Sequence, residues 1–405
     1  MIEGTIGRIK VGDLHPVRVM AVINLSQESF YKGSVATTNQ ALSKARSLVE
    51  EGADLIDLGA VSTAPGSSRI DEAMERERLL PALQQILDIG LEVSVDTQRA
   101  SIADQALSMG ATCINDVSGL MDKAMVKSVA DHDASVVIMA SRRVPGDMLT
   151  MNDILSVLLD RVSLAVVAGV ARDKIVVDPG IGKWIPEKKP EHDLAILDGF
   201  RRLRTLRRPV MAALSRKSFI GARLDQPDPS QRLCGSLSAT AIAIYNGAHI
   251  VRTHDVSLSL DAIRIAEAIR GRPSRSDEGD IFVEVLGHLG HESDIVATLK
   301  LIEVDQGGYE ALCRKGSFRL LAVGGISSME AIIIKQEMLA RGGDAAIPKM
   351  ALRCDPEPQK ILILGTMSQV SGLVRKLKDQ PFRLPSVGKA IEEALKQIYD
   401  PGRYR

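Results

Sequence analysis

Residues 211–221 read MAALSRKSFIG, and this stretch shows how the first two thirds of the chain are organised. The apolar run 210–214 predicts a buried strand. The run ends at Ser215-Arg216-Lys217-Ser218, so two cations and two hydroxyls come directly after a buried strand and before any turn residue. A polar loop cap would explain one isolated strand end of this kind. The interpretation therefore depends on the residues at the ends of the other strands.

The same pattern recurs from residue 18 to about 270. Short β-branched runs alternate with segments of helical spacing, and a glycine often ends the helix, as at Gly52, Gly110 and Gly247. Such alternation predicts parallel strands joined by crossover helices. A doubly wound sheet would also contain these units, but eight uninterrupted units favour a closed (β/α)8 TIM barrel over residues 1–270. The eight runs are 19–26, 55–60, 92–97, 113–118, 135–140, 174–180, 209–215 and 249–255.

The rest of the chain has a weaker pattern. The polar stretch 271–280, GRPSRSDEGD, predicts a linker, and residues 281–405 predict a small α/β accessory domain. Strands are expected near 282–290, 317–326 and 360–367. Helices are expected over 327–343, where Ser327 and Glu330 have capping-box spacing, and over 386–398. This region shows no obvious catalytic set, so a docking, regulatory or oligomerising role is expected.

The composition limits the function classes. Lysine and arginine total 51, as do aspartate and glutamate, so the net charge of zero argues against non-specific nucleic-acid or membrane-surface binding. No apolar run reaches the roughly 18 residues of a membrane helix, and no signal-peptide pattern is visible. The four cysteines are far apart in the sequence, which argues against disulfides and zinc and predicts a cytoplasmic protein.

The predicted strand ends carry a set of polar residues. The carboxyl ends of the strands line the active site of a TIM barrel, so these residues should meet in one pocket. Asp96, Asn115 and Asp178 supply acceptors and an amide, which suit a flat heterocycle. Lys217, Arg252 and His254 supply cations near the last two strands, where many barrels hold a phosphate. The residues therefore predict a phosphorylated heterocycle as ligand. Asp57 lies inside its run and is expected to be structural, and Met139 is expected either in the core or as an apolar floor under the ligand.

Seven segments together resemble the dihydropteroate synthase family of pterin-binding barrels. They are VINLSQESF, GADLIDLGAVSTAPG, SVDTQ, INDVSG, VDPGIG, LSRKSFIG and VRTHDV, which occur in family order with family-like spacing. The resemblance implies that an arylamine displaces pyrophosphate from 6-hydroxymethyl-7,8-dihydropterin pyrophosphate. It also implies a homodimer that acts on small molecules.

The resemblance further implies roles for individual residues. The pterin would be held by Asp96, Asn115, Met139, Asp178 and Lys217. The pyrophosphate would be held by Asn24, Arg252 and His254, with magnesium at Asn24. The arylamine would be bordered by Thr63, Pro65 and Ser218. Lys217, Arg252 and His254 would carry the catalysis.

Three loops depart from the family pattern. Gln27 and Glu28 stand where the family has Pro-Asp, Ala64 stands where it has arginine, and Lys183-Trp184 come after DPGIG where it has an aromatic residue and glycine. This pattern resembles the archaeal branch, which implies methanopterin-type biosynthesis and an arylamine that bears a ribofuranosyl phosphate. Lys183 would then border the arylamine. Two other functions stay open: a methyltransferase that uses a methylpterin and a corrinoid partner, and a non-catalytic pterin-binding protein.

Overall fold

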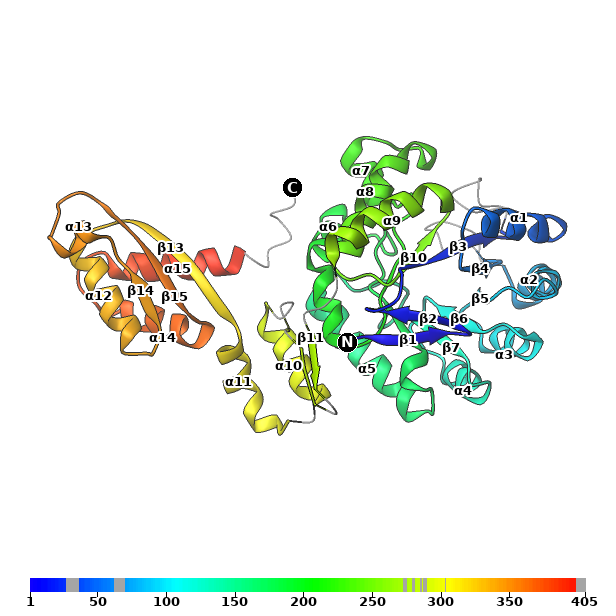
Figure 1. Cartoon of the computed structure of the whole chain (residues 1–405), viewed down its shortest axis with the longest axis horizontal. Coiled ribbons are helices and arrows are strands. Elements are labelled where there is room, and N and C mark those ends of the chain that lie inside the picture. Colours follow the sequence, from blue (N-terminus) through cyan, green and yellow to red (C-terminus); the bar gives the residue numbers. More distant parts are fainter. Residues whose placement is uncertain are drawn as a thin grey trace. The chain divides into compact units, whose positions relative to one another are not determined.

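The chain forms two compact units, Met1–Leu286 and Gly287–Arg405 (Figure 1). The structure is a computed structural model. It describes residues 1–26, 36–61, 70–271, 275–278, 281–284, 286, 290–302 and 304–397. Within these residues, no helix has both the length and the apolar character needed to cross a bilayer.

The first unit contains the predicted barrel. Its sheet has the strand order β8-β7-β6-β5-β4-β3-β10-β9, and every neighbouring pair is parallel. A parallel bridge between Val177 and Val210 joins the two ends of this order and closes the barrel. The (β/α)8 prediction is therefore confirmed. The strands are β3 (Arg18–Asn24), β4 (Leu55–Gly59), β5 (Val93–Asp96), β6 (Cys113–Asp116), β7 (Ser135–Met139), β8 (Ile175–Asp178), β9 (Met211–Ala212) and β10 (Ile250–Thr253).

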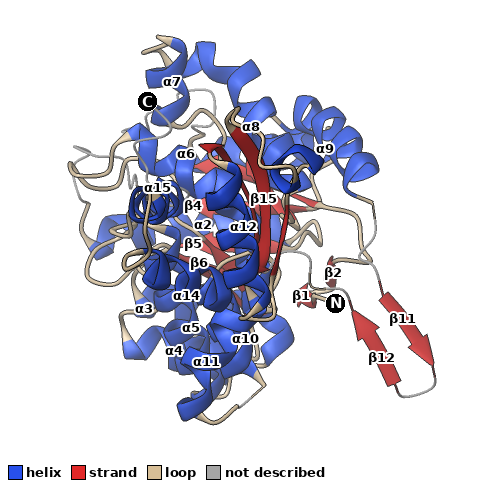
Figure 2. Ribbon diagram, turned by 90° about the vertical axis from the view of Figure 1, so that its left-hand side faces the viewer, coloured by secondary structure: helices blue, strands red, loops and turns tan. Residues whose placement is uncertain are grey.

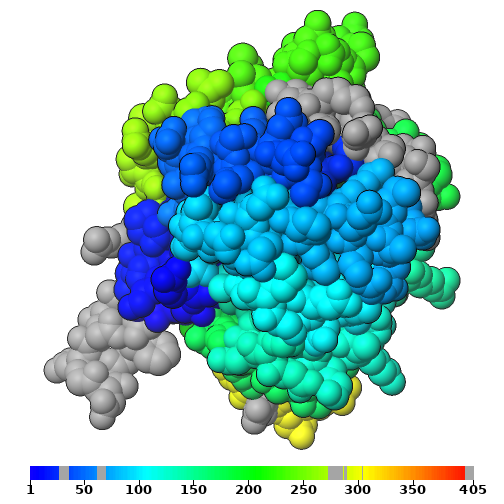
Figure 3. Space-filling model, turned by 90° about the vertical axis from the view of Figure 1, so that its right-hand side faces the viewer, coloured from blue at the N-terminus to red at the C-terminus, as the bar shows by residue number. Residues whose placement is uncertain are grey.

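Helices connect the barrel strands, and their apolar faces pack on the outward side chains of the strands in one large buried cluster. Figure 3 shows α1 to α4 side by side in chain order on the outer surface. The predicted glycines Gly52, Gly110 and Gly247 all have positive φ, as residues that end a helix often do. The helices are α1 (Thr38–Glu50), α2 (Glu72–Leu87), α3 (Ala100–Met109), α4 (Lys123–Asp131), α5 (Met151–Val167), α6 (Pro190–Asp198), α7 (Ser218–Leu224), α8 (Leu233–Tyr245) and α9 (Val256–Arg270).

An N-terminal hairpin closes the end of the barrel at which the strands begin. Its strands are β1 (Glu3–Ile6) and β2 (Ile9–Gly12), and Ile6 and Val11 join the inward-facing barrel side chains in one buried cluster. The buried carboxylate of Asp13 ties this hairpin to the barrel. It accepts hydrogen bonds from the backbone N–H of Ile2 (2.7 Å), from both Nη atoms of Arg204 (2.7 and 3.1 Å) and from His249 Nε2 (3.2 Å).

The predicted linker 271–280 contains regular structure. Residues Arg275–Glu278 form β11, which pairs antiparallel with β12 (Ile281–Glu284), as Figure 2 shows. The two compact units divide after Leu286, beyond the predicted boundary. A polar stretch that resembles a linker can form a strand here because the backbone of the next β-branched segment supplies its hydrogen-bond partners.

The second unit has a three-stranded antiparallel sheet in the order β13-β15-β14. The predicted strands near 317–326 and 360–367 correspond to β13 (Phe318–Ile326) and β15 (Gln359–Thr366). The predicted capping box is present on α12 (Ser328–Leu339), where Glu330 N donates to Ser327 Oγ at 3.2 Å and Ser327 N donates to Glu330 Oε2 at 2.7 Å. The other elements are β14 (Asp344–Ala346), α10 (Glu292–Leu301), α11 (Tyr309–Gly316), α13 (Lys349–Leu352), α14 (Met367–Leu377) and α15 (Leu384–Gln397).

Candidate active site

A cavity, open at its mouth, lies at the carboxyl ends of the barrel strands. All eight strands contribute to its lining, so the predicted convergence of strand ends occurs. The structure brings together every pterin and pyrophosphate residue predicted from the sequence. These are Asn24, Asp96, Asn115, Met139, Asp178, Lys217, Arg252 and His254.

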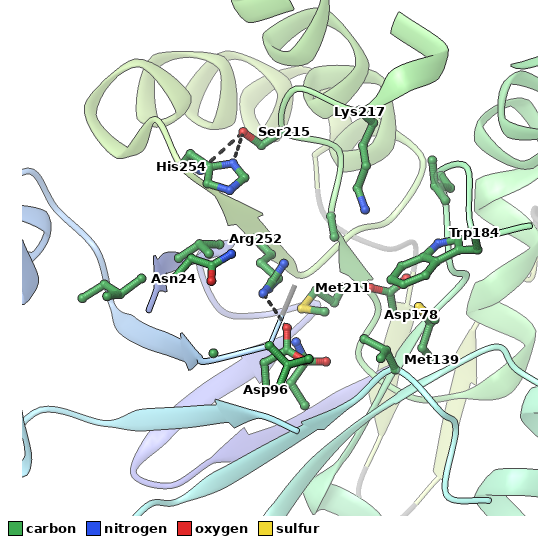
Figure 4. A pocket seen from close by; sticks show the side chains of 18 residues that line it. Asn24, Asp96, Met139, Asp178, Trp184, Met211, Ser215, Lys217, Arg252 and His254 are labelled. Carbon is green, nitrogen blue, oxygen red and sulfur yellow. Dashed lines mark hydrogen bonds and ion pairs between the residues drawn. The ribbon is translucent and has the colours of Figure 1, made fainter. Parts of the chain in front are cut away.

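Asp178 and Lys217 occupy one side of the cavity, with Met139 and Trp184 beside them (Figure 4). Asp178 Oδ1 accepts a hydrogen bond from Gly180 N at 2.7 Å, which leaves Oδ2 for a ligand. Burial raises the pKa of Asp178, although the Gly180 N–H and the Lys217 ammonium oppose the shift. Burial also lowers the pKa of Lys217 to about 8, while Asp178 opposes that shift. An acceptor and a donor thus face the same cavity.

The loop after β8 makes room for the Lys217 side chain. Gly182 has φ +126, and a Cβ atom there would lie 3.3 Å from Lys217 Nζ. On the same loop, the Trp184 ring centroid lies 5.2 Å from Nζ, within cation–π range. The loop is anchored by the buried Lys188, whose Nζ donates to Gly180 O at 2.6 Å.

The two adjacent cations after β9 have different positions. Arg216 adopts φ +57 and turns away from the cavity. Its Nε and Nη2 donate to the two carboxylate oxygens of Asp255 at 3.0 and 2.7 Å, and its Nη1 donates to the carbonyl of Pro229 at 2.9 Å. Lys217 therefore enters the cavity, and Arg216 braces the loop.

Arg252 lies at the centre of the cavity and reaches toward β4 and β5. Its Nε donates to Asp57 Oδ2 at 2.6 Å and its Nη2 donates to Asp96 Oδ2 at 2.8 Å. Burial raises the pKa of Asp96 to about 7, although the positive charge of Arg252 opposes the shift. Burial alone would lower the pKa of Arg252, but Asp57 and Asp96 more than compensate and raise it. This guanidinium stays charged and is held on two carboxylates.

His254 differs from the sequence prediction in its charge. Burial and the neighbouring Arg252 lower its pKa to about 3, so the imidazole is neutral at neutral pH in this arrangement. The sequence predicts three cations at this end of the cavity, and the structure supplies two of them, Lys217 and Arg252. His254 Nδ1 lies 2.9 Å from Ser215 Oγ, and His254 N donates to the same oxygen at 3.3 Å. The Ser215 hydroxyl can donate to Nδ1 when the imidazole proton is on Nε2, or accept from Nδ1 in the other tautomer.

Asn24 ends β3 on the cavity, and its Oδ1 accepts from Ser26 N at 3.0 Å. One amide oxygen fits magnesium only if substrate oxygens and water complete the shell, which is how Mg²⁺ is often held in proteins. Elsewhere in the described ranges, no group of three or more His, Cys, Asp or Glu side chains could hold a metal ion.

The structure describes only two of the four predicted arylamine residues, Ser218 and Lys183. Ser218 begins α7 and Lys183 is exposed, and neither lines the cavity. Thr63 and Pro65 lie outside the described residues, as do the altered positions Gln27, Glu28 and Ala64. Trp184 lines the cavity, whereas the sequence marks it only as a departure from the family pattern. The single tryptophan of the chain, on a loop directly after a strand end, was the available signal.

Comparison with known proteins places this arrangement in a family. The sequence profile of the family described as "Pterin binding enzyme" matches residues 20–254. The chain belongs to the pterin-binding enzyme family. The matched region lies within the first unit, so the family match does not extend to the second unit.

Similar pterin-binding enzymes include the dihydropteroate synthase of Bacillus subtilis. It is 38% identical over 244 residues, which cover 59% of this chain and 83% of that protein. A probable bifunctional folylpolyglutamate synthase/dihydropteroate synthase of Halobacterium salinarum is also 38% identical, but the chain spans only 31% of its length.

Solved structures of pterin-binding enzymes are also similar. The Thermus thermophilus dihydropteroate synthase in complex with 6HMPPP has a TM-score of 0.56 and 35% identity, covering 66% of this chain and 99% of that one. The Xanthomonas albilineans enzyme with 4-aminobenzoic acid has a TM-score of 0.59 and 33% identity, covering 64% and 95%.

Proposed function

We propose that this chain is a dihydropteroate synthase. It would join the exocyclic methylene carbon of 6-hydroxymethyl-7,8-dihydropterin pyrophosphate to the nitrogen of an arylamine. The C–O bond to pyrophosphate breaks, the C–N bond forms, and the amine proton leaves to solvent or to pyrophosphate. The observation that carries the proposal is one cavity in which Asp96, Asn115 and Asp178 converge with Lys217.

The pterin would lie on the side of Asp178 and Lys217. A buried carboxylate binds two adjacent N–H donors strongly, and the guanidine-like edge of a pterin presents such donors to Asp178. The ammonium of Lys217 would donate to an acceptor on the opposite edge of the ring. Met139 is buried and lines the cavity beside Asp178, so its thioether would pack against the flat face of the heterocycle.

The pyrophosphate would lie on the side of Asn24, Arg252 and His254. Aromatic amines are weak nucleophiles, so the rate should depend on stabilising the departing pyrophosphate. Arg252 supplies positive charge, and the neutral His254 would supply an Nε2–H donor when the Ser215 hydroxyl donates to its Nδ1. Magnesium held by Asn24 and substrate oxygens would neutralise developing charge.

The second substrate would be p-aminobenzoate or the larger ribofuranosyl-aminobenzene phosphate. Complexes of similar enzymes with 4-aminobenzoate support the first. The second rests on the altered loops, with Ala64 in place of the family arginine and with Lys183 after the strand that carries Asp178. A phosphate on the amine would need a cationic partner that a small benzoate does not.

Two further features support parts of this proposal. Neighbouring helices α8 and α9 expose Tyr245, Ile265 and Ile269, which are 48%, 65% and 67% accessible. We infer that this apolar surface forms a homodimer contact.

The scattered cysteines suit a reducing cytoplasm, where pterin substrates would be made.

The alternative functions differ in the co-substrate that they need. A methyltransferase acting on a methylpterin has no pyrophosphate to bind, so the joint presence of Lys217, Arg252 and His254 argues against it. Incubating the protein with the pterin pyrophosphate and p-aminobenzoate, and measuring pyrophosphate, tests the proposal. Methyl transfer to a corrinoid protein, or tight pterin binding without turnover, would identify one of the alternatives instead.

A further inference from the structure

Asp57 lies behind the cavity wall and contacts two residues that line it. Its side chain is fully buried in the middle of β4. Its Oδ2 accepts from Asn115 Nδ2 at 3.1 Å and from Arg252 Nε at 2.6 Å. A structural brace at this position would explain its burial, but not why both of its bonds go to cavity residues.

The contact with Asn115 determines how the amide is oriented. A carboxylate without a proton can only accept hydrogen bonds, so the amide nitrogen must face Asp57. The amide oxygen and the second N–H of Nδ2 then point away from Asp57. Because Asn115 lines the cavity, it offers a ligand one acceptor and one donor in a fixed order.

We propose that Asp57 is a positioning residue that selects the orientation of the Asn115 amide for pterin recognition. The inference rests on the proposed function. The fixed acceptor–donor order of Asn115 complements an edge that carries an amino group next to a ring nitrogen that accepts, as the 2-amino edge of a pterin does. Asp57 would thereby contribute to specificity for 2-aminopteridines without touching them.

The second contact of Asp57 strengthens this selection. Asn115 Nδ2 and Arg252 Nε share one acceptor atom, so the amide and the guanidinium are adjacent. If that oxygen were removed, Arg252 Nε would keep a buried N–H without a partner. The Asn115 amide could then turn over and offer its own oxygen to this N–H. The carboxylate of Asp57 therefore keeps the amide nitrogen of Asn115 turned toward Asp57. Without that carboxylate, the orientation with the amide oxygen toward Arg252 is favoured.

The test compares two ligands, 6-hydroxymethyl-7,8-dihydropterin and its analogue without the 2-amino group. Calorimetry on the full chain measures the dissociation constant of each ligand. The ratio of the analogue's constant to that of the dihydropterin is the factor by which the 2-amino group improves binding. For Asp57→Leu, which is close in shape and has no acceptor, we expect this factor to fall by roughly tenfold, because the 2-amino group loses the Asn115 oxygen as an acceptor and keeps only Asp178. The matched control is Asp57→Asn, whose amide oxygen can take the place of Oδ2 and accept from both donors. It should keep the factor within about threefold of the unaltered protein.

A double-mutant cycle shows whether Asp57 acts through Asn115. On an Asn115→Ala background, Asp57→Leu should change the factor by less than about twofold, because the residue through which it acts is gone. If Asp57→Leu does not fold, Asp57→Ala removes the same acceptor with less volume and should reduce the factor in the same direction. The inference is overturned if Asp57→Leu, or Asp57→Ala in its place, leaves the factor unchanged. It is also overturned if Asp57→Asn reduces the factor as much as the variant without the acceptor does. Failure of the unaltered protein to bind the dihydropterin would instead overturn the proposed function.

Discussion

Asp178 offers the sharpest test of the pterin pocket, through the substitution Asp178→Asn. Asparagine keeps the shape of the side chain, and its oxygen can still accept from Gly180 N, now 2.7 Å from Oδ1. Its amide nitrogen would point into the cavity in place of Oδ2, so a donor would meet the donors of the pterin edge. Each buried donor left unpaired costs about 1–3 kcal/mol, so two cost roughly 2–4 kcal/mol after partial relaxation. This corresponds to a dissociation constant raised by about 30- to 900-fold.

Calorimetry with 6-hydroxymethyl-7,8-dihydropterin measures this change directly. The control is Asp116→Asn, which alters a buried carboxylate on the neighbouring part of the sheet that binds the backbone N–H groups of Ser118 and Leu120. It should lower the melting temperature and leave the affinity within about threefold, since Asp116 does not line the cavity. Equal affinity for Asp178→Asn and the unaltered protein would refute the assignment of this carboxylate to the pterin.

Four other outcomes are expected. The kcat/KM for the pterin pyrophosphate should fall as the pH rises through about 8, where Lys217 loses its proton, and Lys217→Met should abolish this limb of the profile. Hydrogen bonds from His249 and Arg204 outweigh burial and hold the pKa of Asp13 well below its usual range, so Asp13→Asn should cost about 3–5 kcal/mol at pH 7. Denaturation should show that this difference shrinks as the pH falls below about 4, where the carboxylate of the unfolded chain gains a proton that the native one resists. A fragment of residues 1–286 should unfold cooperatively on heating, because the barrel closes on itself, and a molten fragment would show that the second unit is integral. Steady-state kinetics should favour the ribofuranosyl-aminobenzene phosphate over p-aminobenzoate by roughly tenfold, and Lys183→Ala should remove the preference if one ion pair carries it.

The barrel and most of the cavity could be predicted because they arise from short-range patterns. Strand and helix periods predict the βα units, and the parallel direction of the strands then places polar strand ends at one rim. The sequence does not predict the N-terminal hairpin. It is held by contacts between residues far apart in the chain, such as Asp13 with Arg204, and no local pattern reports such pairs.

The roles of neighbouring residues needed the structure. Arg216 and Lys217 are adjacent cations in the sequence. The positive φ of Arg216 turns its side chain to brace the loop while Lys217 enters the cavity, and the sequence does not report this backbone angle. The charge of His254 depends on burial and on the distance to Arg252, which the sequence does not contain. The position of Asp57 inside its run predicts a structural residue, but its link to Asn115 joins two strands that are not neighbours, which no local pattern reports.

The central claim is that this chain condenses a dihydropterin pyrophosphate with an arylamine. The most direct measurement is the stoichiometry of turnover, with pyrophosphate and the pterin–arylamine product quantified in one reaction. We expect one pyrophosphate for each product molecule, with both signals lost when either substrate is omitted. Pyrophosphate release that does not depend on the arylamine, or no release with either amine while the pterin binds, would contradict the claim.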